Sequence, residues 1–133
     1  MYSNFDMVKE FHNEFDVPVM WEGWPPTGDM IKRRWSLLNE EYEELWQELF
    51  DYEDGKVVPA LEPDKKKVAK EIADMLYVIY GMADVFGIPI DKVFEEVHSS
   101  NMSKLGTDGR PVRREDGKIM KGSNYKEPDL SWL

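Results

Sequence analysis

The fold is decided by residues 63–86, which read PDKKKVAKEIADMLYVIYGMADVF. Apolar side chains recur there in steps of four and three residues, which is the spacing of one face of an α-helix. The members of this face are Val68, Ile72, Met75, Ile79, Met82 and Phe86. Further apolar residues widen the face, so we expect this helix to be buried on more than one side. Pro63 is expected to open the helix, and Gly87 and Pro89 to end it.

A second long helix is predicted from Asp29, as its N-cap, to about residue 49. Its apolar face repeats the same steps and is formed by Ile31, Trp35, Leu38, Tyr42, Leu45 and Leu49. The helix is expected to end beside the turn dipeptide Asp54-Gly55. Shorter helices are predicted over residues 4–15 and 90–104.

Long antiparallel helices joined by short loops predict the all-α class, here an antiparallel helical bundle in a single domain over residues 1–133. The helices are few and their apolar faces are wide. We therefore expect a second copy of the chain to complete the core, in a homodimer or homotetramer. The basic tail, residues 105–133, is expected to be irregular or to form a β-hairpin around the turn dipeptide Asp116-Gly117.

The composition of the chain limits the classes of function and of partner that it can have. The 133 residues include no cysteine, which excludes disulfides, thiolate metal ligands and a cysteine nucleophile. The net charge of −10 argues against a nucleic-acid polymer as partner. The sequence shows no signal-peptide core and no run of membrane-spanning length, so we expect a cytoplasmic protein with no membrane contact. Residues 104–133 carry 5 acids against 7 Lys and Arg, which suits an anionic ligand or simply a solvated tail.

Acidic residues flank the two long apolar faces in the same way. Glu41 and Glu44 each precede a member of the first face, and Glu71 and Asp74 each precede a member of the second. If the faces pack together, all four carboxylates border one seam.

That crowding is unfavourable without a cation, and the nearby lysines 65–67 and 70 lie mostly on the preceding turns. Oxygen ligands without histidine or cysteine favour Mg²⁺, or Mn²⁺, over Zn²⁺. A solvated acidic helix face is the alternative reading of these residues. Asp74 weighs against it, because this acid lies inside the most apolar helix.

The acidic pattern resembles that of the all-α nucleoside triphosphate pyrophosphohydrolases, which include MazG-like enzymes, dimeric dUTPases and phosphoribosyl-ATP pyrophosphohydrolases. The family pattern is EExxE followed by ExxD, and here it reads EEYEE at residues 40–44 and EIAD at residues 71–74. The resemblance continues at residues 8–12, at 97–105 and at 116–122.

The resemblance implies a role for each matching residue. Glu41, Glu44, Glu71 and Asp74 would hold the metal, and Glu40 would be the general base for the attacking water. The residues that would contact the nucleotide's sugar or phosphates are Asn101, Lys104, Lys118, Lys121 and Arg113 or its neighbour Arg114. The reaction implied is cleavage between the α and β phosphates.

Three hypotheses follow. The first is a metal-dependent pyrophosphohydrolase of a (deoxy)nucleoside triphosphate such as dUTP. The second is a phosphoribosyl-ATP pyrophosphohydrolase of histidine biosynthesis. The third is a non-catalytic helical dimerisation module whose acidic faces keep it soluble, and it predicts no effect of Mg²⁺ on melting.

Overall fold

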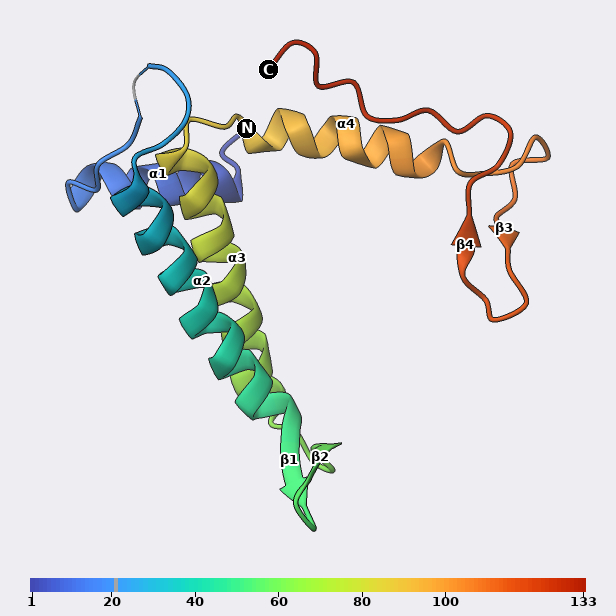
Figure 1. The fold of residues 1–133 in the computed structure, drawn as a ribbon, viewed down its shortest axis with the longest axis horizontal. Helices are drawn as coiled ribbons and strands as arrows, with labels where there is room; N and C mark the ends of the chain where they lie inside the picture. The colour runs from blue at the N-terminus through green and yellow to red at the C-terminus, as the bar shows by residue number, and fades with distance from the viewer. Residues whose placement is uncertain (21) are drawn as a thin grey trace. The chain divides into compact units, whose positions relative to one another are not determined.

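The computed structural model describes residues 1–20 and 22–133, and it is mainly helical. Its helices are α1 (Asn4–Glu14), α2 (Gly28–Leu49), α3 (Lys65–Val85) and α4 (Ile90–Met102). Strands β1 (Phe50–Glu53) and β2 (Lys56–Pro59) form one antiparallel hairpin, and β3 (Val112–Arg113) and β4 (Ile119–Met120) form another (Figure 1). The chain divides into two compact units, residues 1–88 and 89–133. The prediction of a helical protein is therefore confirmed, with two small sheets added to it.

In the first unit, α2 and α3 run side by side, with the β1–β2 hairpin at one end and α1 at the other (Figure 1). The buried apolar side chains are Phe5 and Val8 of α1 with Ala83 and Val85 of α3. The ring of Phe5 also stacks on Tyr80, with centroids 6.1 Å apart. The core of this unit thus lies where α1 meets the C-terminal half of α3.

Side-chain caps fix where α2 and α3 begin. The Thr27 hydroxyl accepts the N–H of Met30, so α2 begins one residue before Asp29, which was wrongly predicted as the cap. The Asp64 carboxylate accepts two N–H groups of the first turn of α3. Pro63 therefore precedes the helix instead of opening it, because a carboxylate cap satisfies two donors that proline leaves unpaired.

Two hairpins have an Asp-Gly dipeptide at the turn, and only the hairpin in the tail was predicted. The tail hairpin, β3–β4, forms around Asp116-Gly117 as expected. The β1–β2 hairpin was missed, although Asp54 and Gly55 both have positive φ (50° and 76°), as the tight turn of a hairpin requires. The signal was this dipeptide between two runs of β-forming residues.

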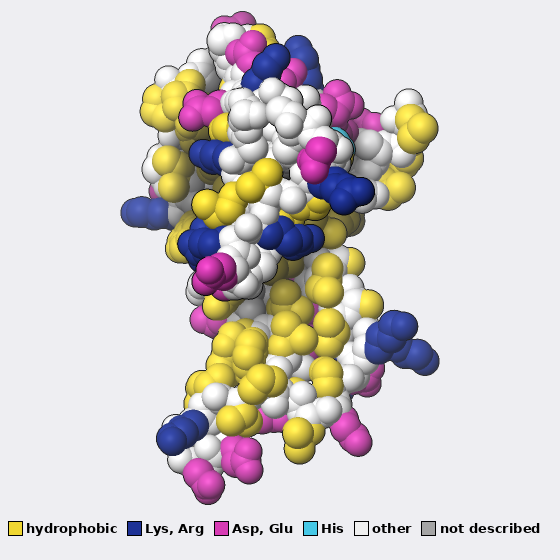
Figure 2. Space-filling view, turned by 90° about the vertical axis from the view of Figure 1, so that its right-hand side faces the viewer, with side chains coloured by type: hydrophobic (Ala, Val, Ile, Leu, Met, Phe, Trp, Pro, Cys, Tyr) yellow, Lys and Arg dark blue, Asp and Glu magenta, His cyan; other side chains and the backbone are white. Residues whose placement is uncertain are grey.

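Many large apolar side chains of α2 and α3 are exposed. They include Ile31, Trp35 and Tyr42 of α2 and Ile72, Leu76 and Ile79 of α3. Figure 2 shows apolar side chains gathered on one face of the long α2–α3 pair. Parts of these apolar faces are therefore not covered within the residues that the structure describes, and their covering by a second copy of the chain stays a prediction.

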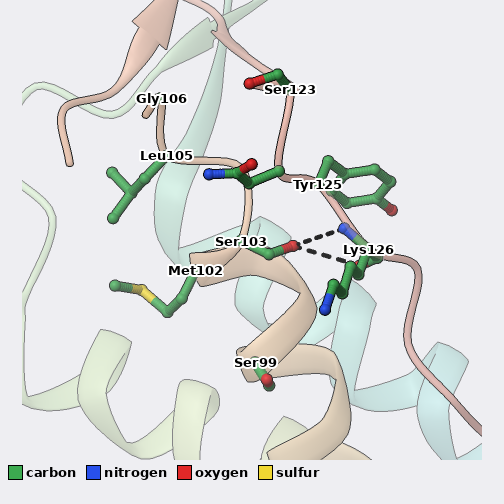
Figure 3. Close-up of a pocket in the computed structure, with 9 residues that line it drawn as sticks. Ser99, Met102, Ser103, Leu105, Gly106, Ser123, Tyr125 and Lys126 are labelled. Carbon is green, nitrogen blue, oxygen red and sulfur yellow. Dashed lines mark hydrogen bonds between the residues drawn. The ribbon is translucent and has the colours of Figure 1, made fainter. Parts of the chain in front are cut away.

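Within the second unit, the tail is held against α4. Ser100 Oγ donates to the carbonyl of Lys126 at 2.8 Å. The N–H of Lys126 donates to Ser103 Oγ at 2.9 Å (Figure 3). The N–H of Gly122 donates to the carbonyl of Lys104 at 3.0 Å. A Cβ at Gly122 would lie 2.7 Å from the carbonyl oxygen of Leu105, so this close approach needs glycine.

No single helix in residues 1–20 and 22–133 has both the length and the apolar character needed to cross a membrane. Helices α3 and α4 meet this criterion only when they are counted together, and then by length and composition alone.

A polar cluster joins the three helices of the first unit. His12 Nδ1 lies 2.6 Å from Asp84 Oδ2, and the His12 side chain is almost fully buried. The guanidinium of Arg34 is buried beside them, and its burial lowers the pKa of this group. Gly81 lies between: a Cβ there would meet Arg34 Nη1 at 3.0 Å and His12 Nε2 at 3.3 Å.

Gly81→Ala is therefore expected to lower the free energy of unfolding by about 1 kcal/mol, because the added methyl group displaces two buried polar groups and this outweighs the helix preference for alanine. Urea unfolding followed by circular dichroism measures it. Gly28→Ala in the first turn of α2 is the control, since nothing lies within 4 Å of its Cβ position. Equal effects of the two substitutions would contradict the close packing at Gly81.

Candidate metal centre

Two neighbouring helices bring four carboxylates together. Glu41 and Glu44 come from α2, and Glu71 and Asp74 from α3. One oxygen from each lies within 4.8 Å of an oxygen of every other. The spacing of three residues within each pair places both acids on the side of the helix that faces its neighbour.

Two of these four acids each have a buried oxygen that accepts no hydrogen bond from the described residues. Glu71 is only 9% exposed, and its Oε2 accepts no hydrogen bond from the residues that the structure describes. The same is true of Oε2 of Glu41. A buried acceptor left unpaired costs about 1–3 kcal/mol, more when it is charged. The oxygens therefore fit a cationic ligand better than they fit the protein's own donors.

The crowding of negative charge in the cluster changes the pKa of Glu41. Burial raises the pKa of its carboxyl, and the negative charges of Glu44, Asp74 and Glu71 raise it further. A side-chain hydrogen bond with Glu44 also raises the pKa of Glu41. A proton is therefore held at this position more tightly than on an isolated glutamate, and a metal ion would have to replace it.

One lysine reaches the cluster, contrary to the sequence-based expectation. Lys70 Nζ lies 2.6 Å from Asp74 Oδ2 and 3.4 Å from Glu71 Oε1. The hydrogen bond to Asp74 raises the pKa of Lys70. Lys70 and Asp74 are four residues apart on one helix, so they face the same side, and this spacing was the signal that could have identified the pair.

The size of the cluster suits a hard divalent cation. Opposite oxygen ligands of Mg²⁺ are about 4.2 Å apart, so carboxylate oxygens within 4.8 Å of one another need only small side-chain rotations to bind it. All the ligand atoms are oxygens, as Mg²⁺ and Mn²⁺ prefer. The side chains present therefore fit the cation that the family resemblance implies.

The remaining predicted residues lie elsewhere. Glu40, on α2, is exposed and is not one of the four clustered acids. Asn101, Lys104, Lys118, Lys121 and Arg113 all belong to the second unit. There Lys121 Nζ lies 4.5 Å from the ring centroid of Tyr125, and Arg113 Nη1 donates to the carbonyl of Gly117 at 3.1 Å.

The second unit also contains a cavity of about 650 Å³ that the sequence did not reveal (Figure 3). It lies between the end of α4 and the returning tail, and its lining residues include Ser99, Met102, Ser103, Tyr125 and Lys126. Asn101 and Lys104 alternate with these residues along the chain. Tyr125 and Lys126 gave no sequence signal, because the tail approaches α4 only in the folded chain.

The helical fold agrees with that of the all-α nucleotide pyrophosphohydrolases, which the sequence resembles. The chain belongs to the phosphoribosyl-ATP pyrophosphohydrolase family, whose family model matches residues 8–101. The match includes both acidic pairs and ends at Asn101.

Two individual proteins are similar to the chain. One is "Uncharacterized protein L479" of Acanthamoeba polyphaga mimivirus, 28% identical over 117 residues that make up 82% of this chain. The chain spans only 38% of the length of that relative. The other is a crystal structure from Exiguobacterium sp. 255-15, named a "putative NTP pyrophosphohydrolase", at 25% identity. The alignment with this structure covers 95% of this chain and 89% of the other chain, with a TM-score of 0.47.

Glu41→Gln is expected to stabilise the protein in EDTA at pH 7, raising the free energy of unfolding by up to about 1 kcal/mol. The folded-state pKa of Glu41 is raised above 4.5, so its ionisation opposes folding, and the wild type should lose stability as pH rises through the window just above 4.5. Thermal melts between pH 4.5 and 7 measure both effects. A wild-type melting temperature that rises steadily over this window, with no gain in the variant, would contradict the assignment.

Proposed function

We propose that this protein is a Mg²⁺-dependent pyrophosphohydrolase that cleaves the α–β anhydride of a (deoxy)nucleoside triphosphate to a monophosphate and pyrophosphate. The observation that supports it is the meeting of four carboxylates from α2 and α3, two of which have a buried oxygen without a donor. The family supports the reaction type. The base preference, dUTP included, and the use of Mg²⁺ or Mn²⁺ belong to the proposal.

Each clustered acid has a defined task in this reaction. Glu41, Glu44, Glu71 and Asp74 would hold the cation, which when bound neutralises phosphate oxygens and lowers the pKa of water. Glu40 precedes Glu41 on α2, and its exposed carboxylate is available to accept the proton of the attacking water. The seam between the helices excludes water from Glu71, which strengthens its interaction with a cation.

The end of α4 and the basic tail, residues 105–133, are proposed to bind the substrate. Asn101 offers hydrogen bonds to the sugar. Positive charge for the phosphates comes from Lys104, Lys118, Lys121 and Arg113. Lysine and arginine bind phosphate oxygens well because these hydrogen bonds are charge-assisted.

Phosphoribosyl-ATP is the second candidate substrate, and the description of the matching family favours it. A pyrophosphate-release screen with Mg²⁺ across the deoxynucleotides, the ribonucleotides and phosphoribosyl-ATP distinguishes the two. No release from any of them, together with no effect of Mg²⁺ on melting, would support the non-catalytic module.

The exposed apolar faces of α2 and α3 support assembly as a homodimer or homotetramer. We also propose a cytoplasmic location for the protein. Sedimentation at micromolar concentration would test the assembly, and a monomer would contradict it.

Glu41→Gln and Asp74→Asn are expected to lower turnover at least about 100-fold with the fold retained, because each removes a charged metal ligand. Pyrophosphate release and the melting increment on adding Mg²⁺ measure activity and binding. Glu43→Gln is the matched control, since Glu43 is exposed on the same helix, lies outside the four clustered acids and accepts a hydrogen bond from Asn39 at 3.4 Å. Full activity in Asp74→Asn would contradict the site.

Glu40→Gln is expected to lower turnover by about 100-fold or more while the affinity for Mg²⁺ is kept, because a base acts on water without binding the metal. Calorimetric titration with Mg²⁺ separates the two properties. Loss of Mg²⁺ binding in this variant would show that Glu40 is a ligand instead.

A further inference from the structure

We propose that Lys70 is an exchangeable counter-ion of the metal centre, whose ammonium is displaced from Asp74 and Glu71 by the divalent cation and then binds a polyphosphate oxygen of the substrate. This inference rests on the proposed function, since it concerns the same four carboxylates. It adds a substrate-positioning residue that the acidic pattern of the family does not contain.

The contacts of Lys70 are made to two of the four clustered acids. Its ammonium lies 2.6 Å from Asp74 Oδ2 and 3.4 Å from Glu71 Oε1. Glu71 is buried, and its second oxygen has no donor among the described residues. Lys70 therefore satisfies only part of the acceptor capacity of this pair.

A divalent cation and this ammonium compete for the same carboxylates. A Mg²⁺ ion bound to Asp74 Oδ2 would lie at most about 4.7 Å from the ammonium at its present position. If the ion used the other oxygen of Asp74, the separation would still be on the order of 7 Å or less. Repulsion over these distances favours a metal-bound centre in which the ammonium has moved away.

Lys70 is free to make that move. Its side chain is 65% exposed, so the ion pair with Asp74 faces solvent and is weak. The flexible four-carbon stem can carry the ammonium to another anion without moving α3.

The charge of the centre gives the displaced ammonium a role. Four carboxylates carry four negative charges, and a single divalent cation neutralises half of them. The negative charge that is left repels a polyphosphate. Lys70 is the cation seen at the cluster, and an ammonium placed there offsets part of that repulsion and supplies donors to a phosphate oxygen.

Calorimetric titration of the full chain with Mg²⁺ tests the first step. Lys70→Gln is expected to bind Mg²⁺ about fivefold more tightly than the wild type, because a competing charge is removed. Lys66→Gln is the matched control: it removes the same charge from the same helix, at an exposed position whose side chain forms no ion pair with the described residues, and it should change affinity less than about twofold. Lys70→Arg should behave as the wild type.

Binding of inorganic pyrophosphate at saturating Mg²⁺ tests the second step. Lys70→Gln is expected to weaken it about fivefold, whereas Lys66→Gln and Lys70→Arg should leave it within about twofold. An unchanged affinity of Lys70→Gln for Mg²⁺ overturns the exchange, and an unchanged affinity for pyrophosphate overturns the substrate contact. If the wild type itself binds no Mg²⁺, the proposed function fails together with this inference; if it binds and the variants do not differ, only the inference fails.

Discussion

The constraint on which the rest of the structure depends is the repulsion between four carboxylates held along the seam of α2 and α3. The packing of α2 against α3 brings these acids together, so packing and electrostatics oppose each other at one place. Among the described residues, the ammonium of Lys70 offsets part of this negative charge. The rest of the negative charge is not offset. The raised pKa of Glu41 reflects this, as do the unpaired oxygens of Glu41 and Glu71.

The two ends of α3 handle buried charge in opposite ways. Near its C-terminus, Asp84 is 2.6 Å from His12 and close to the positive charge of Arg34. The acid there is balanced by groups from two other helices, and Gly81 leaves the space that they occupy. Near its N-terminus, Glu71 and Asp74 face more acids. A cluster that is balanced internally stabilises the fold, whereas one that is not requires something from outside the chain.

Much of this arrangement could be predicted from the sequence, because the period of an α-helix fixes which side chains share a face. That period alone places Glu41 with Glu44 and Glu71 with Asp74. The pairing of His12 with Asp84 could not be predicted, since 72 residues separate them and no local pattern links them. The start of α3 was misplaced because Pro63 and Asp64 both favour a helix start, and the cap that forms more hydrogen bonds decides it. What covers the apolar faces could not be predicted, because periodicity shows which residues share a face but not what packs on it.

The β1–β2 hairpin leaves and rejoins the bundle at nearly one point, since the N–H of Ala60 donates to the carbonyl of Leu49 at 2.8 Å. The ten residues between them are therefore an appendage on the helix pair and not a spacer between the helices. Its exposed Asp54-Gly55 tip is a natural attachment point for a fluorophore or an affinity tag, since it lies outside the two helices that carry the carboxylates. A label at that tip would report on the molecule without disturbing the register in which α2 and α3 present their acids.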